Sequence, residues 1–201
     1  MMRIGLILAG GRATRLGGAD KGLVPFQGEP LALRAYRRLS PQVDRILVSA
    51  NRSFDEYRKV LPSDTELIPD RTDSFPGPLA GLEAAIASLP EESRKETWLF
   101  TVPFFPSDLT EKLIFAANAA GARAAIAEAR GELQPTFACV RADLFPKLEA
   151  YNAAGNHRVR QWFKEIGAAT AVFPDISAFD NCNTFEEIKQ AEQLAFSLSD
   201  R

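Results

Sequence analysis

The chain has 201 residues, of which 46% are apolar and 25% are charged, so we expect one globular domain over residues 1–201. Its 24 Lys and Arg residues nearly balance 26 Asp and Glu residues, which leaves a formal net charge of −2. This composition excludes a disordered or collagen-like chain. Because a charge so close to zero gives no long-range attraction to a polyanion, we expect a small-molecule ligand and neither nucleic acid nor a membrane as partner.

The cysteines and the first apolar run bear on location. The two cysteines, Cys139 and Cys182, stand 43 positions apart, with no second Cys or His at a metal-ligand spacing from either. We interpret this as a reducing, cytoplasmic location. The apolar run at residues 4–9 is six residues long and ends at Gly10-Gly11, so it is too short for a signal-peptide core or a membrane span. It predicts a first β-strand.

Apolar runs rich in β-branched residues alternate with stretches of helical spacing along the chain. The runs predict strands at residues 4–9, 45–50, 66–68, 98–102 and 169–173, and the stretches predict helices at residues 30–39, 53–60, 79–89, 107–120, 142–152 and 184–195. Residues 122–129 and 136–141 flank a polar turn at residues 130–132 and predict a hairpin added to the sheet. This alternation predicts an α/β fold of three layers, Rossmann-like, with a mostly parallel central sheet covered by helices on both faces.

Two predicted helices begin with capping residues. Ser107 and Asp108 are the candidates for the helix after Pro106, and Thr184 with Glu187 fits a capping box, in which Asn183 can share.

The most informative segment is the loop that follows the first predicted strand. Residues 6–22 contain five glycines and three cations. Glycines let backbone N–H groups approach an anion closely, and Arg12, Arg15 and Lys21 can neutralise a triphosphate. The carboxyl end of a parallel strand is also where open α/β sheets bind ligands. The alternative is a glycine-rich surface turn with solvated cations.

Two better-known phosphate motifs are absent from this loop. Asp20 precedes Lys21 and Gly22 follows it, so no Gly-x4-Gly-Lys-Ser/Thr occurs, and Gly-x-Gly-x-x-Gly is also missing. A P-loop or dinucleotide-binding fold is therefore unsupported.

The segment that begins at Leu8 and ends at Gly22 resembles the opening signature of the bacterial molybdenum cofactor guanylyltransferases, Leu-Ala-Gly-Gly-x-x-x-Arg-Met-Gly-Gly-x-Asp-Lys-Gly, with only Leu16 in place of Met. The resemblance runs from about residue 3 to about residue 190. Further matches follow in chain order: Ala50-Asn51-Arg52, Asp70 with Pro76-Gly77-Pro78-Leu79-Ala80-Gly81, Pro103-Phe104, Gly155-Asn156-His157-Arg158-Val159, and Phe179-Asp180-Asn181-Cys182-Asn183-Thr184.

This resemblance implies a nucleotidyltransferase fold and transfer of GMP from GTP to the terminal phosphate of molybdenum-bearing molybdopterin, with Mg²⁺ as cofactor. It implies contacts with other molybdenum cofactor biosynthesis proteins, and we expect a monomer. Arg15 and Lys21 are the catalytic residues that we expect to stabilise the triphosphate. The nucleotide-binding residues that it implies are Leu8, Ala9, Gly10, Gly11, Lys21, Asn51, Asp70, Gly77, Pro78 and Leu79, and those for the cofactor substrate are Asn181 and Asn183.

The residue pattern agrees with several of these roles. Asn51 and Asp70 each follow a predicted strand, so they share the ligand-binding edge of the sheet with the loop, and their side chains can bind guanine or ribose. The alternatives are a turn-forming Asn and a solvated loop. Pro78 stands near a helix start whose free N–H groups can face a base or a phosphate, or it marks an ordinary helix entry. Asn181 and Asn183 alternate, so an extended stretch directs both to one side.

The chain departs from the family at one position of chemical weight. The family has Cys-Asp-x-Pro-Phe at the end of the fourth strand, where the Asp holds magnesium, and this chain has Thr101 in its place. A loss of about 4 kcal/mol in transition-state stabilisation would lower the rate about a thousandfold. The explanations are a weakened or non-catalytic relative, an altered residue, or a carboxylate from elsewhere, for which Asp20 is favoured over Asp180 and Asp108 is expected to be a helix cap.

The remaining candidates favour structural roles. His157 is the single histidine, so no Ser-His-Asp or multi-His site can form, and a surface position is expected. Trp98 and Trp162 are expected in the core. Two alternatives to guanylyl transfer stay open: a GTP- or cofactor-binding relative without catalysis, and a transferase that acts on a sugar or alcohol phosphate, although related cytidylyltransferases commonly open with Ala-Ala-Gly.

Overall fold

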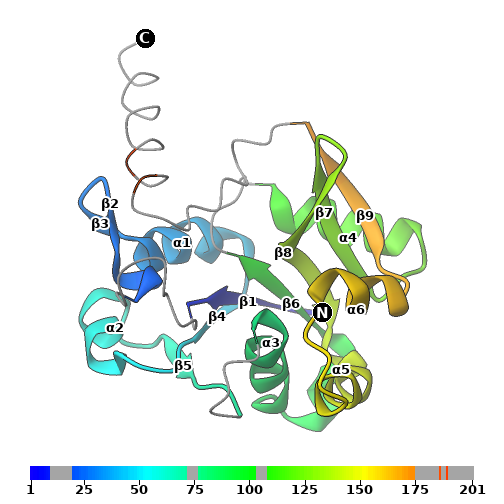
Figure 1. The fold of residues 1–201 in the computed structure, drawn as a ribbon, viewed down its shortest axis with the longest axis horizontal. Coiled ribbons are helices and arrows are strands. Elements are labelled where there is room, and N and C mark those ends of the chain that lie inside the picture. The colour runs from blue at the N-terminus through cyan, green and yellow to red at the C-terminus, as the bar shows by residue number, and fades with distance from the viewer. Residues whose placement is uncertain (10–19, 72–76, 103–107, 175–185, 187–188, 190–201) are drawn as a thin grey trace.

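Seven strands form the central sheet in the part of the chain that the computed structural model describes, which is residues 1–9, 20–71, 77–102, 108–174, 186 and 189. Their order is β5-β4-β1-β6-β8-β7-β9 (Figure 1). The bounds are β1 Met2–Leu8, β4 Arg45–Ser49, β5 Glu66–Ile68, β6 Thr97–Val102, β7 Ala124–Ala129, β8 Glu132–Arg141 and β9 Ala169–Phe173.

The strand directions make the sheet mostly parallel. β1 pairs in parallel with β4 and β6, β4 with β5, and β7 with β9. β8 is antiparallel to both of its neighbours, β6 and β7. The expected hairpin is thus confirmed as β7 and β8, and β8 begins earlier than predicted because Glu132 to Gln134 already pair with β7.

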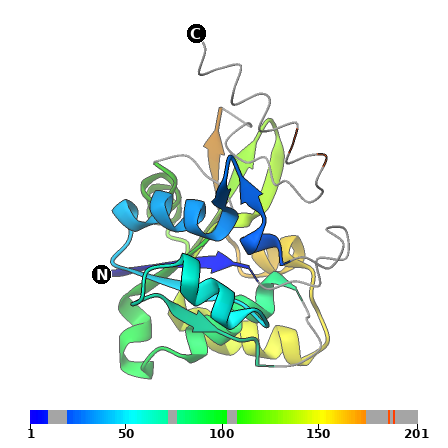
Figure 2. The ribbon, with the colours of Figure 1, turned by 90° about the vertical axis from the view of Figure 1, so that its left-hand side faces the viewer.

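Helices cover both faces of the sheet, as predicted. The bounds are α1 Leu31–Leu39, α2 Phe54–Val60, α3 Pro78–Ala87, α4 Leu109–Ala119, α5 Phe145–Ala153 and α6 Val159–Glu165. α1, α2 and α4 contribute to one apolar cluster, and α3, α5 and α6 contribute to the other. Figure 2 shows the sheet between α1 and α4 on one side and α3 and α5 on the other.

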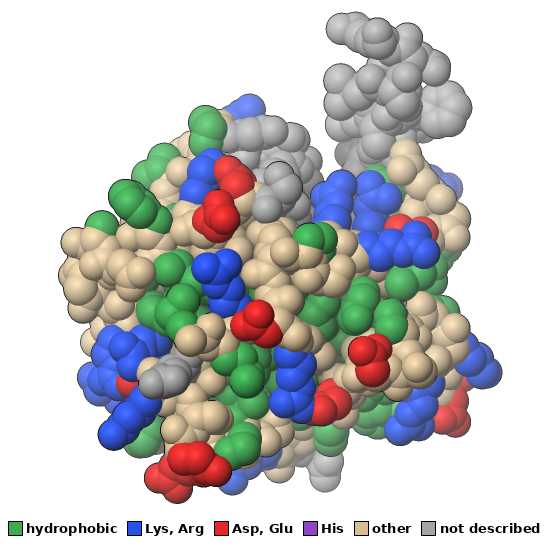
Figure 3. Space-filling view, turned by 180° about the vertical axis from the view of Figure 1, so that it is seen from behind, with side chains coloured by type: hydrophobic (Ala, Val, Ile, Leu, Met, Phe, Trp, Pro, Cys, Tyr) green, Lys and Arg blue, Asp and Glu red, His purple; other side chains and the backbone are tan. Residues whose placement is uncertain are grey.

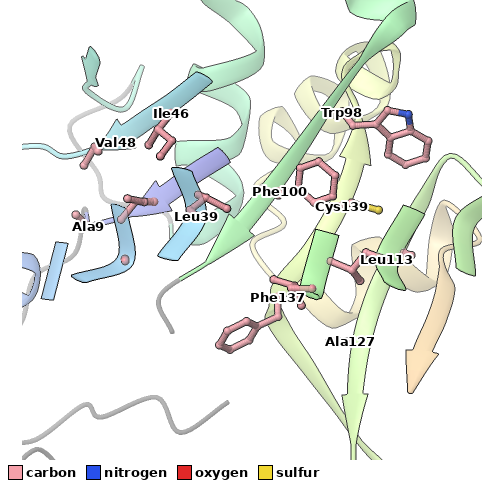
Figure 4. Packing of buried hydrophobic residues seen from close by; sticks show 14 of the residues in the cluster. Ala9, Leu39, Ile46, Val48, Trp98, Phe100, Leu113, Ala127, Phe137 and Cys139 are labelled. Atoms are coloured by element: carbon pink, nitrogen blue, oxygen red, sulfur yellow. The ribbon is translucent and has the colours of Figure 1, made fainter. Parts of the chain in front are cut away.

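Alternation along the strands creates the two clusters. In β6, Trp98 and Phe100 pack in the cluster with α1 and α4, whereas Leu99 packs in the cluster with α3 and α5. Figure 4 shows the first cluster, where Phe100 lies near Cys139. Successive strand side chains point to opposite faces, so a sheet covered on both faces requires apolar residues at nearly every position. Each large side chain buried in this way contributes roughly 1.5–3 kcal/mol to folding.

One glycine in β1 allows α1 to lie close to the sheet. A Cβ at residue 5 would overlap the Leu39 side chain at the end of α1. The apolar run of β1 therefore contains a glycine where the helix above it needs the space.

Several elements differ from the predicted ones. The helix expected at residues 142–152 is a 3-10 turn, η5 Ala142–Leu144, followed by α5. The hairpin of β2 Pro25–Phe26 and β3 Glu29–Pro30, the helix α6, and the 3-10 turns η2 Lys21–Leu23, η3 Ser40–Gln42 and η4 Glu91–Glu96 were not predicted. Of the helix expected at residues 184–195, only residues 186 and 189 are described, and both are helical.

The capping prediction for α4 is wrong in its mechanism. Asp108 occupies the N-cap position, but its side chain makes no capping hydrogen bond. Its carboxylate instead pairs with the Lys112 ammonium at 2.6 Å, one helical turn away. Ser107, Thr184 and Glu187 lie outside the described residues.

The isolated aromatic and titratable residues lie where the sequence predicts. Trp98 and Trp162 are buried in the two clusters, and His157 is exposed. Cys139 is a buried free thiol, and burial raises its pKa to about 12, so it is an unreactive core residue. On the face shown in Figure 3, basic and acidic side chains lie among one another. In the described ranges, none of the helices has the length and apolarity needed to span a bilayer.

Truncation of Leu99 tests the two-sided core. This side chain is fully buried at the centre of the sheet, so Leu99→Ala is expected to lower the free energy of unfolding by about 2–5 kcal/mol. Val172→Ala is the control, because Val172 is 66% exposed on β9 and its truncation is expected to change stability by less than about 0.5 kcal/mol. Urea unfolding followed by circular dichroism measures both, and equal midpoints would contradict the assigned layers.

Candidate functional site

The carboxyl ends of the parallel strands β1, β4, β5 and β6 meet at one edge of the sheet. Leu8 at the end of β1 pairs with Ser49 at the end of β4, and Ser49 pairs with Ile68 at the end of β5. The ladder continues past the strands, because the Ala9 N–H donates to the Ser49 carbonyl at 2.9 Å and the Ala50 N–H donates to the Ile68 carbonyl at 3.0 Å. The segments that follow β1, β4 and β5 therefore leave the sheet side by side.

Asn51 and Asp70 are brought into direct contact at this edge. The Asn51 amide Nδ2 donates to Asp70 Oδ2 at 2.8 Å, and the Asp70 backbone N–H donates to Asn51 Oδ1 at 2.7 Å. The two bonds are reciprocal, so the pair ties the loop after β4 to the loop after β5. Both residues are half-buried, which leaves part of each polar group accessible to a ligand.

The Asp70 carboxylate is held in a partly apolar environment. Burial raises its pKa, and nearby Glu83 adds to the increase, whereas hydrogen bonds from Asn51 and Ser49 act in the opposite direction. The Ser49 hydroxyl donates to Asp70 Oδ1 at 3.4 Å. Burial is the largest of these effects, so this carboxylate gains from a ligand that donates hydrogen bonds to it.

Two glycines of the predicted Gly77 to Gly81 turn place α3 against this pair. Gly77 has φ of +95° and ψ of −167° at the N-cap of α3, a conformation that L side chains rarely adopt. A Cβ at Gly81 would lie 2.6 Å from Ser49 Oγ. Gly81 thus lets the helix approach the Ser49 hydroxyl that bonds Asp70. Pro78 occupies the first helical position, as predicted, and Leu79 is buried beneath it.

Lys21 lies at the same edge, opposite the end of β1. It begins η2, and it lines a small pocket of about 20 Å³ together with Ile7, Leu8 and Ala9. Gly22 and three residues of α1 complete the lining. The structure therefore brings together the predicted nucleotide-binding residues Leu8, Ala9 and Lys21.

Asp20, the residue before Lys21, is buried and held by two side chains. The Tyr57 hydroxyl donates to Asp20 Oδ1 at 2.5 Å, and Arg52 Nε lies 3.6 Å from Asp20 Oδ2. Burial raises the pKa of Tyr57, and the bond to Asp20 raises it further, so the phenol stays protonated and donates. A Cβ at Gly22 would overlap the Tyr57 hydroxyl, so glycine is needed at this position.

Arg71, directly after Asp70, connects this edge to two helices. Its Nη1 donates to Glu83 Oε1 of α3 at 2.9 Å and to Glu149 Oε1 of α5 at 3.0 Å. Glu83 Oε2 also accepts a 2.6 Å hydrogen bond from the Asn152 amide. Arg71 therefore pairs with Glu83, the acidic residue whose charge adds to the increase in the pKa of Asp70.

The described residues do not fit a magnesium site formed by the protein alone. Thr101 lies in β6 with its backbone paired to Leu6 and Ala138, so its position at the strand end is the expected one but the carboxylate is missing. Both oxygens of Asp20 already have partners. Within the ranges that the structure covers, no three His, Cys, Asp or Glu residues come together as a metal site.

Some predicted site residues lie outside the described part of the chain, and some residues at the edge were not predicted. Gly10, Gly11, Arg15, Asn181 and Asn183 are in the first group. Ser49, Tyr57 and Glu83 are in the second. Arg52 belonged to a matched motif, but Tyr57 gives no sequence signal apart from a polar atom on the buried face of its helix.

A broad groove of about 710 Å³ lies elsewhere, between α4 and β9. Its lining is largely alanine, with exposed Phe115 and Val172, and it contains none of the predicted site residues. The predicted site residues that the structure describes converge at the carboxyl edge and not in this groove.

The arrangement at the carboxyl edge suits recognition of a nucleotide. A cation and the backbone of a strand end lie on one side, and a carboxylate paired with an amide lies on the other. Carboxylate and amide groups can bind the hydrogen-bonding edges of a base or the hydroxyls of a ribose, and a lysine neutralises phosphate charge.

Comparison with solved structures shows the same fold in nucleotidyltransferases. A crystal structure of molybdopterin-guanine dinucleotide biosynthesis protein A from Archaeoglobus fulgidus superposes with a TM-score of 0.74 over 98% of this chain and all of that chain, at 20% identity. The 4-diphosphocytidyl-2C-methyl-D-erythritol synthase from Anaerococcus prevotii gives a TM-score of 0.72 over 97% of this chain and 96% of that chain, at 14% identity.

Sequence comparison is more specific. A protein of Burkholderia ambifaria named molybdenum cofactor guanylyltransferase is 45% identical over 195 residues, which cover 92% of each chain. One of the same name from Cupriavidus pinatubonensis is 37% identical over 198 residues, 94% of this chain and 95% of the relative. Residues 5–170 match the family described as the MobA-like NTP transferase domain. The chain therefore belongs to the MobA-like NTP transferase family.

Proposed function

We propose that this chain transfers GMP from GTP to the terminal phosphate of molybdenum-bearing molybdopterin and releases pyrophosphate. The observation that carries the proposal is the 45% identity, over 92% of each chain, to a relative named molybdenum cofactor guanylyltransferase. The site supports it, because Lys21 and the Asn51–Asp70 pair stand at one sheet edge. The fold alone does not choose the base or the acceptor, since a diphosphocytidyl-methylerythritol synthase shares it.

The reaction needs charge neutralisation and positioning more than acid or base chemistry. An oxygen of the acceptor phosphate attacks the α-phosphorus of GTP, and the bond between the α-phosphorus and the bridging oxygen to the β-phosphorus breaks as pyrophosphate leaves. Phosphoryl transfer of this kind depends mainly on holding the groups in line and stabilising oxygen charge. We assign that stabilisation to Lys21, Arg15 and the backbone N–H groups of the loop that begins at Gly10 and Gly11.

The guanosine part is assigned to the pair at the ends of β4 and β5. Guanine presents adjacent N–H donors, which suit a carboxylate, and the Asp70 carboxylate lacks full solvation because it is partly buried. Asn51 fixes the orientation of that carboxylate through its amide. Gly77, Pro78 and Leu79 at the start of α3 and the alternating Asn181 and Asn183 complete the proposed nucleotide and acceptor sites.

Magnesium is proposed to arrive on the triphosphate, as part of the substrate. Among the described residues, no three His, Cys, Asp or Glu side chains come together to hold the ion, so no step is assigned to a protein-bound ion. Thr101, which stands where the family has an aspartate, favours a second candidate function, a GTP-binding relative that retains the site and lacks turnover. The two candidates differ in pyrophosphate release and agree in GTP binding.

Nucleotide titration tests the proposal and separates the two candidates. GTP is expected to bind at least about tenfold more tightly than ATP or CTP, because the donor pattern of guanine matches the Asp70 carboxylate and that of adenine or cytosine does not. Calorimetry with and without Mg²⁺ measures binding, and pyrophosphate release with molybdopterin measures turnover. Equal affinity for the three nucleotides would contradict guanosine recognition, and selective binding without release would establish the second candidate.

A carboxylate at position 101 is expected to raise activity. Thr101→Asp restores the acidic residue that the family has at the end of β6, and a gain of about 4 kcal/mol would increase the Mg²⁺-dependent rate up to about a thousandfold. Thr101→Asn is the matched control, because an asparagine side chain has nearly the same shape as an aspartate and carries no charge. A well-folded Thr101→Asp protein with an unchanged or lower rate, or an equal increase in the Asn variant, would refute the argument for a missing ligand.

Removing the charge of Asp70 is expected to separate stability from binding. Because burial raises the pKa of Asp70, the folded chain holds this proton more tightly than the unfolded chain, and stability is lost as the pH rises through the folded-state pKa. Asp70→Asn therefore gains stability relative to the original chain as the pH rises from about 4, the ordinary carboxyl pKa, toward neutrality. It keeps an acceptor for Asn51, yet it is expected to bind GTP about tenfold more weakly.

Urea unfolding across this pH range, with GTP calorimetry at neutral pH, measures both effects. Asp55→Asn is the control, since the Asp55 side chain is 81% exposed on α2. Parallel pH profiles for Asp70→Asn and the original chain would contradict the assigned effect of burial.

A further inference from the structure

We propose that Asp20 and Tyr57 are positioning residues, which form an anchor that holds Lys21 in place for the triphosphate, and that Asp20 is not a metal ligand. This inference rests on the proposed function for the role of Lys21. The anchor itself consists of Asp20, Tyr57, Arg52 and Gly22, and its contacts are independent of any ligand.

The Asp20 carboxylate faces the interior and its two oxygens have separate partners. The residue is 9% exposed, its Oδ1 accepts a 2.5 Å hydrogen bond from Tyr57, and its Oδ2 lies 3.6 Å from Arg52 Nε. A buried carboxylate is stable only when it is paired and hydrogen-bonded in this way. Its side chain therefore fixes the backbone of residue 20 relative to α2.

The backbone carries this restraint to Lys21. The Asp20 carbonyl accepts from the Leu23 N–H at 3.0 Å, and the Lys21 carbonyl accepts from the Val24 N–H at 3.2 Å. These bonds close the turn η2 around Lys21. Gly22 packs against the Tyr57 ring without space for a Cβ, so the same tyrosine restrains the residues on both sides of the lysine.

Tyr57 is itself a fixed support. Its side chain is fully buried in the cluster that contains Ile46 and Val48 of β4. Its backbone is bonded on both sides, to Ser53 and Leu61, within α2. A phenol held in a close-packed core cannot follow the turn if the turn moves, so the hydrogen bond acts as a rigid restraint.

The partners of Asp20 also oppose its use as a metal ligand. The Arg52 guanidinium beside Oδ2 repels a divalent cation, and the Tyr57 O–H directs a proton at Oδ1. A metal ion at Asp20 would have to displace both groups. The carboxylate that the sequence favoured as a replacement for the one missing at Thr101 is thus committed to holding the turn.

Tyr57→Phe removes only the hydroxyl and tests the anchor. Affinity for GTP is expected to fall about tenfold, because the turn that presents Lys21 loses a charge-assisted hydrogen bond. The control is Tyr151→Phe on α5, where the ring is also buried and its hydroxyl donates to the Arg158 carbonyl at 3.1 Å. This variant is expected to leave the GTP affinity unchanged. Equal GTP affinity in Tyr57→Phe and the original chain would overturn the proposal.

A magnesium titration of Asp20→Asn distinguishes an anchor from a ligand. If Asp20 is an anchor, Asp20→Asn and Tyr57→Phe each weaken GTP binding, and the Mg²⁺ concentration that gives half-saturation stays unchanged. The double variant Asp20→Asn/Tyr57→Phe then has a GTP affinity no lower than that of the single variant with the lower affinity, because both changes break the same hydrogen bond. A shift in the Mg²⁺ midpoint confined to Asp20→Asn would overturn the proposal in favour of a metal ligand.

Hydrogen exchange of the backbone amides tests the anchor in the absence of nucleotide. The Leu23 and Val24 amides are expected to exchange several-fold faster in Tyr57→Phe than in Tyr151→Phe, since they close the restrained turn. Unchanged exchange would overturn the anchor. If the original chain binds no GTP while these amides respond as expected, the anchor stands and the proposed function fails, so the two outcomes are distinguishable.

Discussion

The parallel backbone ladder between β1 and its neighbours is the constraint on which the site depends. It sets Leu8 opposite Ser49 and Ser49 opposite Ile68, and it extends past β1 through the hydrogen bond from Ala9 to Ser49. Because each strand end is fixed relative to the next, Ala9 and Ser49, which are 40 positions apart along the chain, form a hydrogen bond at this edge. The glycines of β1 and α3 serve the same end, since they let α1 and α3 lie close to this ladder from opposite faces.

Two aspartates at this edge show how environment assigns different tasks to one residue type. Asp20 has a phenol and a guanidinium as partners, so its hydrogen-bonding capacity is used within the protein. The Asp70 carboxylate accepts hydrogen bonds from the Asn51 amide and, at 3.4 Å, from the Ser49 hydroxyl. It is half-buried, and burial raises its pKa, so further hydrogen-bond donors would stabilise its charged form. A ligand with N–H groups relieves that cost, whereas both carboxylate oxygens of Asp20 already have partners within the protein. The environments of the two residues therefore favour assigning the proposed guanosine contact to Asp70 and not to Asp20.

Much of the fold follows from local pattern, and much of the site follows from the parallel topology. β5 and β9 begin and end where predicted, and Asn51 and Asp70 share an edge because each follows a parallel strand. The misses have physical causes. α6 is short and most of its residues are exposed, so its two buried residues, Trp162 and Phe163, show no helical periodicity in the sequence. The Asp108 side chain forms an ion pair with Lys112 and does not cap α4. Tyr57 and Ser49 act through tertiary contacts between segments distant in sequence, which no local pattern encodes.

The place of residue 101 in the sheet does not depend on a carboxylate side chain. The backbone of β6 is held on both sides, by β1 and by β8, so residue 101 keeps its place in the sheet whatever its side chain. The ladder uses only N–H and C=O groups, and threonine is well suited to a strand. The hydrogen bonds of the Asn51–Asp70 pair lie at the ends of β4 and β5 and involve no group of residue 101. The proposed guanosine site at the ends of β4 and β5 and position 101 in β6 are therefore held by different strands of the sheet.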